Sequence, residues 1–335
     1  MHKKIKIFFL ENSYDYNGND LDSFKIGGSE KTLINISNEL AKDKLFEIKV
    51  YNNTSSEVMI NNVYWSNINN IKKSENPNYV ICMSDANLFR KISCKNNFLW
   101  SHSVQSLEKF IRKKQLFPYI KYKPTLILEG KYHYKTRSYL TSFFGKQILK
   151  IAPDKDFINT KINLDTIPPP NAIFTTKSDR NIDFLLNAWN LIKKSNFNSK
   201  LLINPPYSLN EEQINNSIIL RKKGDKNLLI KDLLNSKIFL TPGHKTEVFC
   251  LAADEARELC IPIVTMGYGC LYERVEHNKT GFIAKNKQEF VNYANLILKN
   301  DKVYLELRNN LIKRRNSRNY NHVKNDFIKI LNINV

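Results

Sequence analysis

The sequence has few acidic residues, no closely spaced cysteine pair and no long apolar run. Its 335 residues include 32 Asp and Glu against 52 Lys and Arg. No apolar run approaches the ~18 residues that a transmembrane helix needs. Lys6 interrupts the apolar start and Glu11 ends it. This pattern predicts a first strand over residues 4–10 instead of a signal peptide.

The cysteines indicate a reducing environment. There are five, an odd number, and none forms a Cys-x2-Cys pattern: Cys82, Cys94, Cys250, Cys260 and Cys270. Three of them, Cys82, Cys250 and Cys260, lie within apolar runs. Free buried thiols fit this pattern better than disulfides or a zinc site. We therefore expect a cytoplasmic protein.

The net charge of +20 has three possible explanations. One is a Lys- and Asn-rich bias without functional meaning. Another is attraction to an anionic membrane face or to acidic substrates. The third is nucleic-acid binding, which no recognisable RNA- or DNA-binding motif supports. The lysines are spread along the whole chain, so no single basic tail decides between the first two.

Length and periodicity predict two α/β domains. A chain of 335 residues is too long for one ordinary core. Apolar strand-like runs alternate with helix-like stripes, which indicates two Rossmann-like, doubly wound domains facing across a cleft. We expect the first domain over 1–155, a proline-stiffened linker over 156–170 and the second domain over 171–317. A final helix at about 318–335 is expected to cross back to the first domain.

The stretch from Thr246 to Ala256 carries the strongest chemical pattern. Glu247 and Glu255 stand eight positions apart, with an apolar run between them. The surrounding residues predict a strand over 237–240, a loop, a helix over about 249–259 and a strand over 261–265. A helix N-terminus suits a diphosphate, and carboxylates are suited to holding sugar hydroxyls.

Three further groups of residues lie at the ends of predicted strands or the starts of predicted helices, which is where such sheets bind ligands. Gly27 and Gly28 follow the first strand and open a helix, for which Ser29 is the expected N-cap. His102 ends a strand predicted over 97–103, before a helix over 104–115. Lys177 and Arg180 precede a helix whose apolar stripe includes Leu185. His133, in a later helix, is expected at the surface.

Together these motifs resemble the retaining glycosyltransferases of the GT-B fold, family 4, also described as glycosyl transferases group 1. The pair Glu247 and Glu255 matches the Glu-x7-Glu signature, and residues 27–30 match a Gly-Gly-x-Glu loop. The run over 267–283 matches the family's Gly-x-x-x-Glu-x-Val and Gly-Phe-Leu pattern. Val248 and Cys250 depart from it, because glycines are usual there.

The resemblance implies roles for these residues. Glu247 would bind hydroxyls of the transferred sugar, Glu255 the ribose of the nucleotide, and His102 would lie by the sugar. Gly27 and Gly28 would adjoin the donor phosphates and the acceptor. The donor loop would comprise Val248, Phe249, Cys250 and Leu251. Arg180 would grip the diphosphate, with Lys177 replacing an arginine expected near Thr175.

The implied activity is transfer of a hexosyl group with retention from a UDP- or GDP-linked sugar. The expected acceptor is a glycan or lipid-linked molecule of cell-surface polysaccharide or lipopolysaccharide synthesis. No cofactor and no metal are expected, and the Asp-x-Asp triplets at 20–22 and 154–156 are read as solvated. Peripheral contact with an anionic membrane is a further expectation. The alternatives are a sugar-nucleotide epimerase of the same fold and a non-catalytic binding module.

Overall fold

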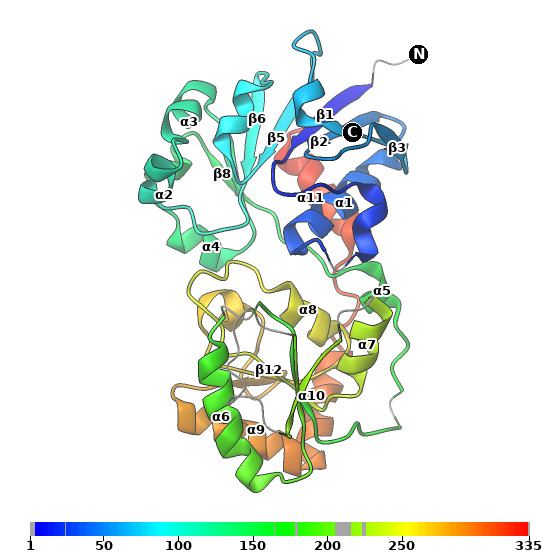
Figure 1. Ribbon diagram of the computed structural model, residues 1–335, viewed down its shortest axis with the longest axis vertical. Coiled ribbons are helices and arrows are strands. Elements are labelled where there is room, and N and C mark those ends of the chain that lie inside the picture. The colour runs from blue at the N-terminus through cyan, green and yellow to red at the C-terminus, as the bar shows by residue number, and fades with distance from the viewer. Residues whose placement is uncertain are drawn as a thin grey trace. The chain divides into compact units, whose positions relative to one another are not determined.

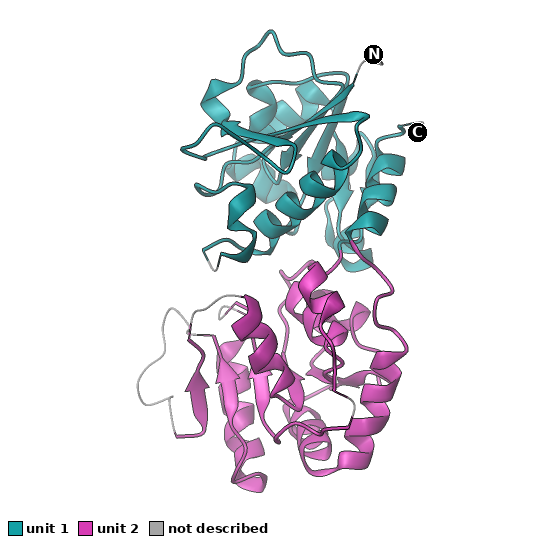
Figure 2. Ribbon diagram, turned by 90° about the vertical axis from the view of Figure 1, so that its right-hand side faces the viewer, with its two compact units in different colours: residues 1–151, 320–335 teal, residues 152–319 magenta. Residues whose placement is uncertain are grey.

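The structure is a computed structural model that describes residues 4–23, 25–163, 165–177, 180–204, 216–222 and 226–333. The chain forms two compact units. Unit 1 comprises residues 1–151 and 320–335, and unit 2 comprises residues 152–319 (Figure 2). Residues 156–170 therefore fall in unit 2, and the C-terminal helix falls in unit 1.

Unit 1 is built on an eight-stranded sheet with the order β3-β4-β2-β1-β5-β6-β7-β8. All neighbouring strands are parallel except the β3–β4 hairpin. The strands are β1 (Ile5–Leu10), β2 (Phe46–Asn52), β3 (Val58–Ile60), β4 (Val63–Asn67), β5 (Tyr79–Met83), β6 (Asn96–Trp100), β7 (Thr125–Leu128) and β8 (Lys146–Ile148). Ile7 to Leu10 are all buried, as expected for a strand covered on both faces.

Helices cover both faces of this sheet. On one face α1 (Gly28–Ala41) lies beside α11 (Tyr320–Ile330) (Figure 1). Phe327 of α11 stacks on Phe9, with ring centroids 5.8 Å apart. The other face packs against α2 (Leu107–Arg112) and α3 (Leu116–Tyr122), through a buried cluster that includes Phe8 and Phe110. The helix α4 (Lys131–Thr136) follows β7.

Unit 2 is built on a six-stranded, fully parallel sheet with the order β11-β10-β9-β12-β13-β14. Its strands are β9 (Ala172–Phe174), β10 (Leu201–Ile203), β11 (Ile218–Leu220), β12 (Ile238–Leu240), β13 (Ile263–Thr265) and β14 (Gly281–Ile283). Its helices are α5 (Lys155–Asn159), α6 (Ile182–Ser195), α7 (Lys226–Leu234), α8 (Leu251–Glu258), α9 (Lys287–Lys299) and α10 (Asp301–Ile312). Trp189 of α6 is fully buried in the core.

The predicted α/β class with parallel, Rossmann-like sheets is confirmed. The strands predicted over 4–10 and 261–265 and the helix predicted over about 249–259 are found as β1, β13 and α8, each shorter by one to three residues. All five cysteines are free thiols, and four of them are buried. Among the described residues, no helix is both long and apolar enough to cross a bilayer.

Three local predictions are wrong, and one strand was missed. The N-cap of α1 is Gly27, and Ser29 lies inside the first turn. The helix predicted over 104–115 is shorter, because α2 ends at Arg112 and Lys114 adopts a left-handed φ of 54°. The β3 hairpin strand was not expected. Asp154 is not solvated: it is buried, caps α5 and pairs with Lys226 at 3.1 Å.

Candidate functional site

In unit 2 the predicted donor residues gather in the loop between β12 and α8. Glu247 lies in this loop, where its N–H donates to the carbonyl of His244 at 3.0 Å. The N–H of Cys270 in turn donates to the carbonyl of Glu247 at 3.0 Å. The Glu247 side chain is buried. Two backbone hydrogen bonds therefore fix the position of this carboxylate relative to the end of the sheet.

Gly269 makes this close packing possible. It has a left-handed φ of 67°, and a Cβ there would lie 2.7 Å from the carbonyl oxygen of Glu247. The same Cβ would approach the carbonyl of His244 more closely still. Only glycine combines this φ with such an approach. Gly269 of the 267–283 run thus allows this run to pack closely against the Glu247 loop.

The N-terminus of α8 follows Glu247 directly. Cys250 is the N-cap residue, and its side chain makes no capping hydrogen bond. Val248 and Cys250 are both buried, so their side chains do not occupy the solvent side of the loop, although glycines were expected there. Burial, with the nearby Glu247 charge, raises the pKa of the Cys250 thiol well above its usual value. The thiol is therefore neutral and acts as an apolar filler.

The loop between β9 and α6 packs against the same place. The Arg180 guanidinium donates to the Thr246 hydroxyl and lies 3.4 Å from Nδ1 of His244. The side-chain amide of Asn181 donates to the carbonyl of Gly243. Lys177 is exposed in this loop. Ser178 and Asp179 lie outside the described residues. Arg180 is thus brought to the Glu247 loop from a position 67 residues earlier in the chain.

A buried arginine that the sequence reasoning missed lies behind this loop. The Arg274 guanidinium stacks on the Phe249 ring, 3.9 Å from its centroid, and its Nη1 lies 3.8 Å from Oδ2 of Asp254. Asp254 also pairs with Arg257 at 3.0 Å. Burial opposes the charge of Arg274, yet Asp254 outweighs it, and the net effect raises its pKa. Asp254, one residue before half-buried Glu255, is thus the structural carboxylate of α8.

In unit 1 the Gly27–Gly28 turn surrounds a buried carboxylate. Glu30, in the first turn of α1, accepts hydrogen bonds from Ser13 Oγ at 3.1 Å and from Ser29 Oγ at 3.0 Å. A Cβ on Gly27 would lie 2.9 Å from Oε2 of Glu30. Gly27 therefore leaves room for the Glu30 carboxylate to fold back over the helix start.

A second carboxylate, Glu11, lies at the end of β1 and was not predicted as a site residue. Its Oε1 accepts the N–H of Ser13 at 2.7 Å, and its Oε2 is buried without a hydrogen-bond partner among the described residues. Burial raises its pKa, and the charge of Glu30 raises it further. Two neighbouring carboxylates thus meet beside the Gly27 turn, which no local sequence pattern indicates.

His102 lies just past the end of β6 and is held by Glu129, which follows β7. The distance from His102 Nδ1 to Oε1 of Glu129 is 2.5 Å. The Nε2 atom of His102 is buried and has no hydrogen-bond partner in the described part of the chain. Because Nδ1 faces a carboxylate, it carries a proton, and Nε2 is left to accept or donate a hydrogen bond to a ligand.

His133 is completely buried, and the surface position predicted for it is wrong. Its Nδ1 accepts the N–H of Glu129 at 3.3 Å, and its Nε2 lies 2.9 Å from the carbonyl of Ser103. Burial lowers the pKa of His133 to about 4. The ring is therefore neutral, and it supports the segment that carries Glu129 without facing a ligand.

The strand order explains why these groups gather. His102, Glu129, Glu11 and the Gly27 turn all follow the C-terminal ends of parallel strands in unit 1, and the Arg180 and Glu247 loops do so in unit 2. Such strand ends are where open α/β sheets bind ligands. No three His, Cys, Asp or Glu side chains within the described ranges are grouped as a metal site would require.

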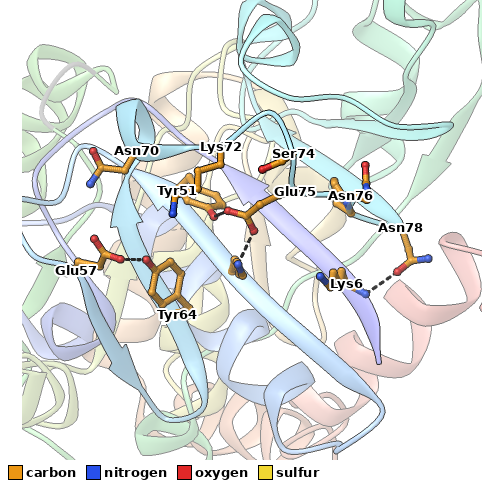
Figure 3. Close-up of a pocket in the computed structure, with 12 residues that line it drawn as sticks. Lys6, Tyr51, Glu57, Tyr64, Asn70, Lys72, Ser74, Glu75, Asn76 and Asn78 are labelled. Carbon is orange, nitrogen blue, oxygen red and sulfur yellow. Dashed lines mark hydrogen bonds and ion pairs between the residues drawn. The ribbon is translucent and has the colours of Figure 1, made fainter. Parts of the chain in front are cut away.

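A separate hollow of about 1000 Å³ lies on the sheet of unit 1 and contains none of the predicted site residues. Its polar groups largely satisfy one another (Figure 3). Glu75 accepts the Tyr51 hydroxyl at 2.6 Å and pairs with Lys49, and Glu57 accepts the Tyr64 hydroxyl. The ammonium of Lys49 also covers the face of the Tyr64 ring. These contacts hold the segment before β5 against β2.

The chain is similar to known glycosyltransferases in part of its sequence and throughout its fold. Residues 176–318, less than half of the chain, match the family model described as Glycosyl transferases group 1. This span includes Lys177, Arg180, Glu247 and Glu255. No curated protein sequence matches the chain.

Several solved structures share the fold over nearly the whole chain, each at 13% identity. The Anabaena protein HepE, solved with UDP and glucose, superimposes with a TM-score of 0.73, covering 98% of this chain and 100% of that one. Sucrose-phosphate synthase from Thermosynechococcus elongatus gives 0.70, covering 98% of both chains. WaaG, a glycosyltransferase involved in lipopolysaccharide biosynthesis, gives 0.69 with 98% and 100% coverage. The fold is therefore that of the GT-B glycosyltransferases.

Proposed function

We propose that this protein is a retaining glycosyltransferase of family 4. It moves a hexosyl group from a UDP- or GDP-linked sugar to a glycan or lipid-linked acceptor in the synthesis of a cell-surface polysaccharide or lipopolysaccharide. The family match over residues 176–318 and the shared fold support the class of enzyme. Unit 2 takes the nucleotide sugar, and unit 1 takes the acceptor.

The observation that carries this proposal is the Glu247 loop. A buried carboxylate stands directly before the N-terminus of α8, whose N-cap side chain leaves the first-turn amides uncapped. Arg180 is held at the same loop through Thr246. Free helix amides and a guanidinium together suit a diphosphate. A carboxylate beside them suits the hydroxyls of the attached sugar.

The chemistry follows from this charge distribution. Negative charge develops on the leaving diphosphate as the bond to the sugar breaks. Arg180, Lys177 and the α8 N-terminus stabilise that charge, which lowers the barrier. Glu247 orients the sugar, and Glu255, half-buried on α8, holds the ribose. This scheme uses no metal and no cofactor, so the proposed reaction should be insensitive to chelators.

In unit 1 we assign the acceptor side to His102, Glu30 and the Gly27–Gly28 turn. Glu129 fixes the His102 tautomer, so that Nε2 is available to a sugar hydroxyl. The missing arginine near Thr175 is compensated by Lys177, a point charge with less directional hydrogen bonding.

The proposed location is the cytoplasm, with peripheral contact to the inner face of an anionic membrane where a lipid-linked acceptor would lie. The charge of +20 supports this contact. We propose no nucleic-acid partner.

The test combines binding and turnover in two variants with a matched control. Glu247→Gln should retain nucleotide diphosphate binding in calorimetry but lose transfer by at least about 100-fold, because it removes a contact to the transferred sugar. Glu255→Gln should instead weaken nucleotide binding. The control is Glu306→Gln, an exposed position on α10. Wild-type transfer by Glu247→Gln would contradict the assignment.

Product analysis separates the alternatives. A glycosyltransferase gives a glycoside whose anomeric configuration, read by NMR, matches that of the donor. An epimerase would convert the nucleotide sugar to its 2-epimer without any acceptor. A binding module would bind the nucleotide and turn over neither.

A further inference from the structure

Unit 1 exposes an unusual set of large apolar side chains on α2, α3 and the turn η4 (Leu140–Ser142). We call this set, together with the basic residues beside it, the apolar–basic surface. Its apolar members are Ile111, Phe117, Ile120, Tyr139, Leu140 and Phe143. Phe117 is 67% exposed, Phe143 77% and Tyr139 83%. An exposed group of this kind marks an interaction site more often than an ordinary surface.

These side chains lie on elements that pack against one another. The helix α2 contacts η4, and α2 and α3 are neighbours on the side of unit 1 away from α1 and α11 (Figure 1). Underneath, Phe110 of α2 packs edge-on against Tyr119 of α3, with ring centroids 5.4 Å apart. Tyr119 lies 5.2 Å from Phe144, whose neighbour Phe143 is exposed. The packing among Phe110, Tyr119 and Phe144 therefore holds together α2, α3 and the segment that carries Phe143.

The same segment concentrates positive charge. Residues 106–150 contain eleven Lys and Arg and only two Glu, a net charge of +9 out of +20 for the whole chain. One of these glutamates, Glu129, is buried against His102, and the other, Glu108, pairs with Arg112 at 2.8 Å. Arg112, Lys113 and Lys114 follow Ile111 directly, and all three are exposed. The segment that carries the exposed rings is thus more basic than the rest of the chain.

We propose that the apolar–basic surface docks unit 1 onto an anionic lipid bilayer. Exposed aromatic and aliphatic side chains enter the headgroup boundary, while lysines and arginines around them contact anionic headgroups. A second copy of the chain is a poor occupant, because a symmetric contact would bring two strongly basic surfaces together. The proposal deepens the proposed function by naming the surface that would meet a lipid-linked acceptor.

The test is cosedimentation of the full chain with vesicles, which needs no transfer reaction and can therefore fail independently of the proposed function. Vesicles of phosphatidylcholine alone are compared with vesicles that also contain phosphatidylglycerol. We expect binding to the anionic vesicles and little to the neutral ones. Raised salt should weaken binding without abolishing it, since the apolar contacts are not screened.

Two paired variants separate charge from insertion. Lys113→Glu with Lys114→Glu should weaken binding at least about 10-fold, whereas Lys72→Glu with Lys73→Glu, an equal charge change at exposed positions elsewhere in unit 1, should have a smaller effect. Phe117→Ser with Phe143→Ser should also weaken binding about 10-fold or more. Its control is Phe197→Ser in unit 2, where the ring is 79% exposed.

Three outcomes would overturn the proposal. One is equal binding to neutral and anionic vesicles. Another is an unchanged affinity in the Phe117 and Phe143 double variant. The third is binding that depends on charge alone and is matched by a soluble acidic polysaccharide, which would make the surface a polyanion site instead. Unchanged melting temperatures of the variants establish that a loss of binding is not a loss of folding.

Discussion

Gly269 supplies a sharp test of how the Glu247 loop is held. In a Gly269→Ala variant the new Cβ would lie 2.7 Å from the carbonyl oxygen of Glu247, and nearer to that of His244. Cβ atoms are essentially never found within 3.0 Å of such atoms. The Glu247 carbonyl must therefore move by at least the 0.3 Å difference, and the His244 carbonyl by more. These are the carbonyls that accept the hydrogen bonds positioning Glu247.

Gly267 is the matched control. It also has a left-handed φ, 70°, so alanine at either site carries a backbone strain of about 1–2 kcal/mol. A Cβ on Gly267, however, would come closest to a side-chain atom, Cγ2 of Ile283 at 2.9 Å, and would meet no backbone atom of the Glu247 loop. Strain of this size should lower the melting temperature of a unit of this length by about 2–8 °C in both variants. Only Gly269→Ala should also move the donor loop.

The assay is calorimetric titration with the nucleotide diphosphate that the wild type binds, together with thermal melting. Gly267→Ala should bind within about 2-fold of the wild type. Gly269→Ala should bind at least about 10-fold more weakly, equivalent to about 1.4 kcal/mol, because the misplaced loop no longer aligns its amides and Arg180 with the ligand. Equal affinities in the two variants would refute the reasoning that Gly269 supports the donor loop.

Three further predictions concern unit 1. Burial lowers the pKa of His133 to about 4, so the contribution of its neutral ring to stability is present above pH ~6.5 and is lost as the pH falls. Between pH ~6.5 and 4, urea unfolding should show a loss in the free energy of unfolding that is about 3 kcal/mol smaller in His133→Gln than in the wild type. Glu129→Gln should lower kcat for transfer about 10-fold or more at unchanged nucleotide affinity, because it replaces the charged partner of His102 Nδ1 with a neutral amide. An unchanged kcat would count against a role for His102. Phe327→Ala should destabilise unit 1 by about 3–5 kcal/mol, since its fully buried ring packs on Phe9, and an unfolding midpoint equal to that of the wild type would show that α11 does not hold unit 1 together.

Local patterns predicted most of the fold because the signals are themselves local. The strand over 4–10 and the helix over about 249–259 follow from apolar patterns, which depend only on residues a few positions apart. The errors occur where a single residue leaves its expected backbone conformation. The left-handed Lys114 follows a helix that ends three residues earlier than the apolar pattern predicts, and Gly27 is the N-cap in place of Ser29.

The same distinction between local and distant residues applies to the site. The spacing of Glu247 and Glu255, and the glycines before α1, are visible in the sequence because one helix start contains each motif. The partners of these residues are not visible. Glu129 contacts His102 from the end of the neighbouring strand, and Arg274 contacts Phe249 from the segment that follows β13.

By itself, the sequence determined two α/β halves, the Glu247–Glu255 helix start and a strongly basic chain without a long apolar run. Only the tertiary structure decided which carboxylates pair with which rings and guanidinium groups, and which large side chains of α2, α3 and η4 are left exposed. The reason is physical. Periodicity is written into neighbouring residues, whereas burial and ion pairing depend on which strand ends and helices the folded sheet brings together.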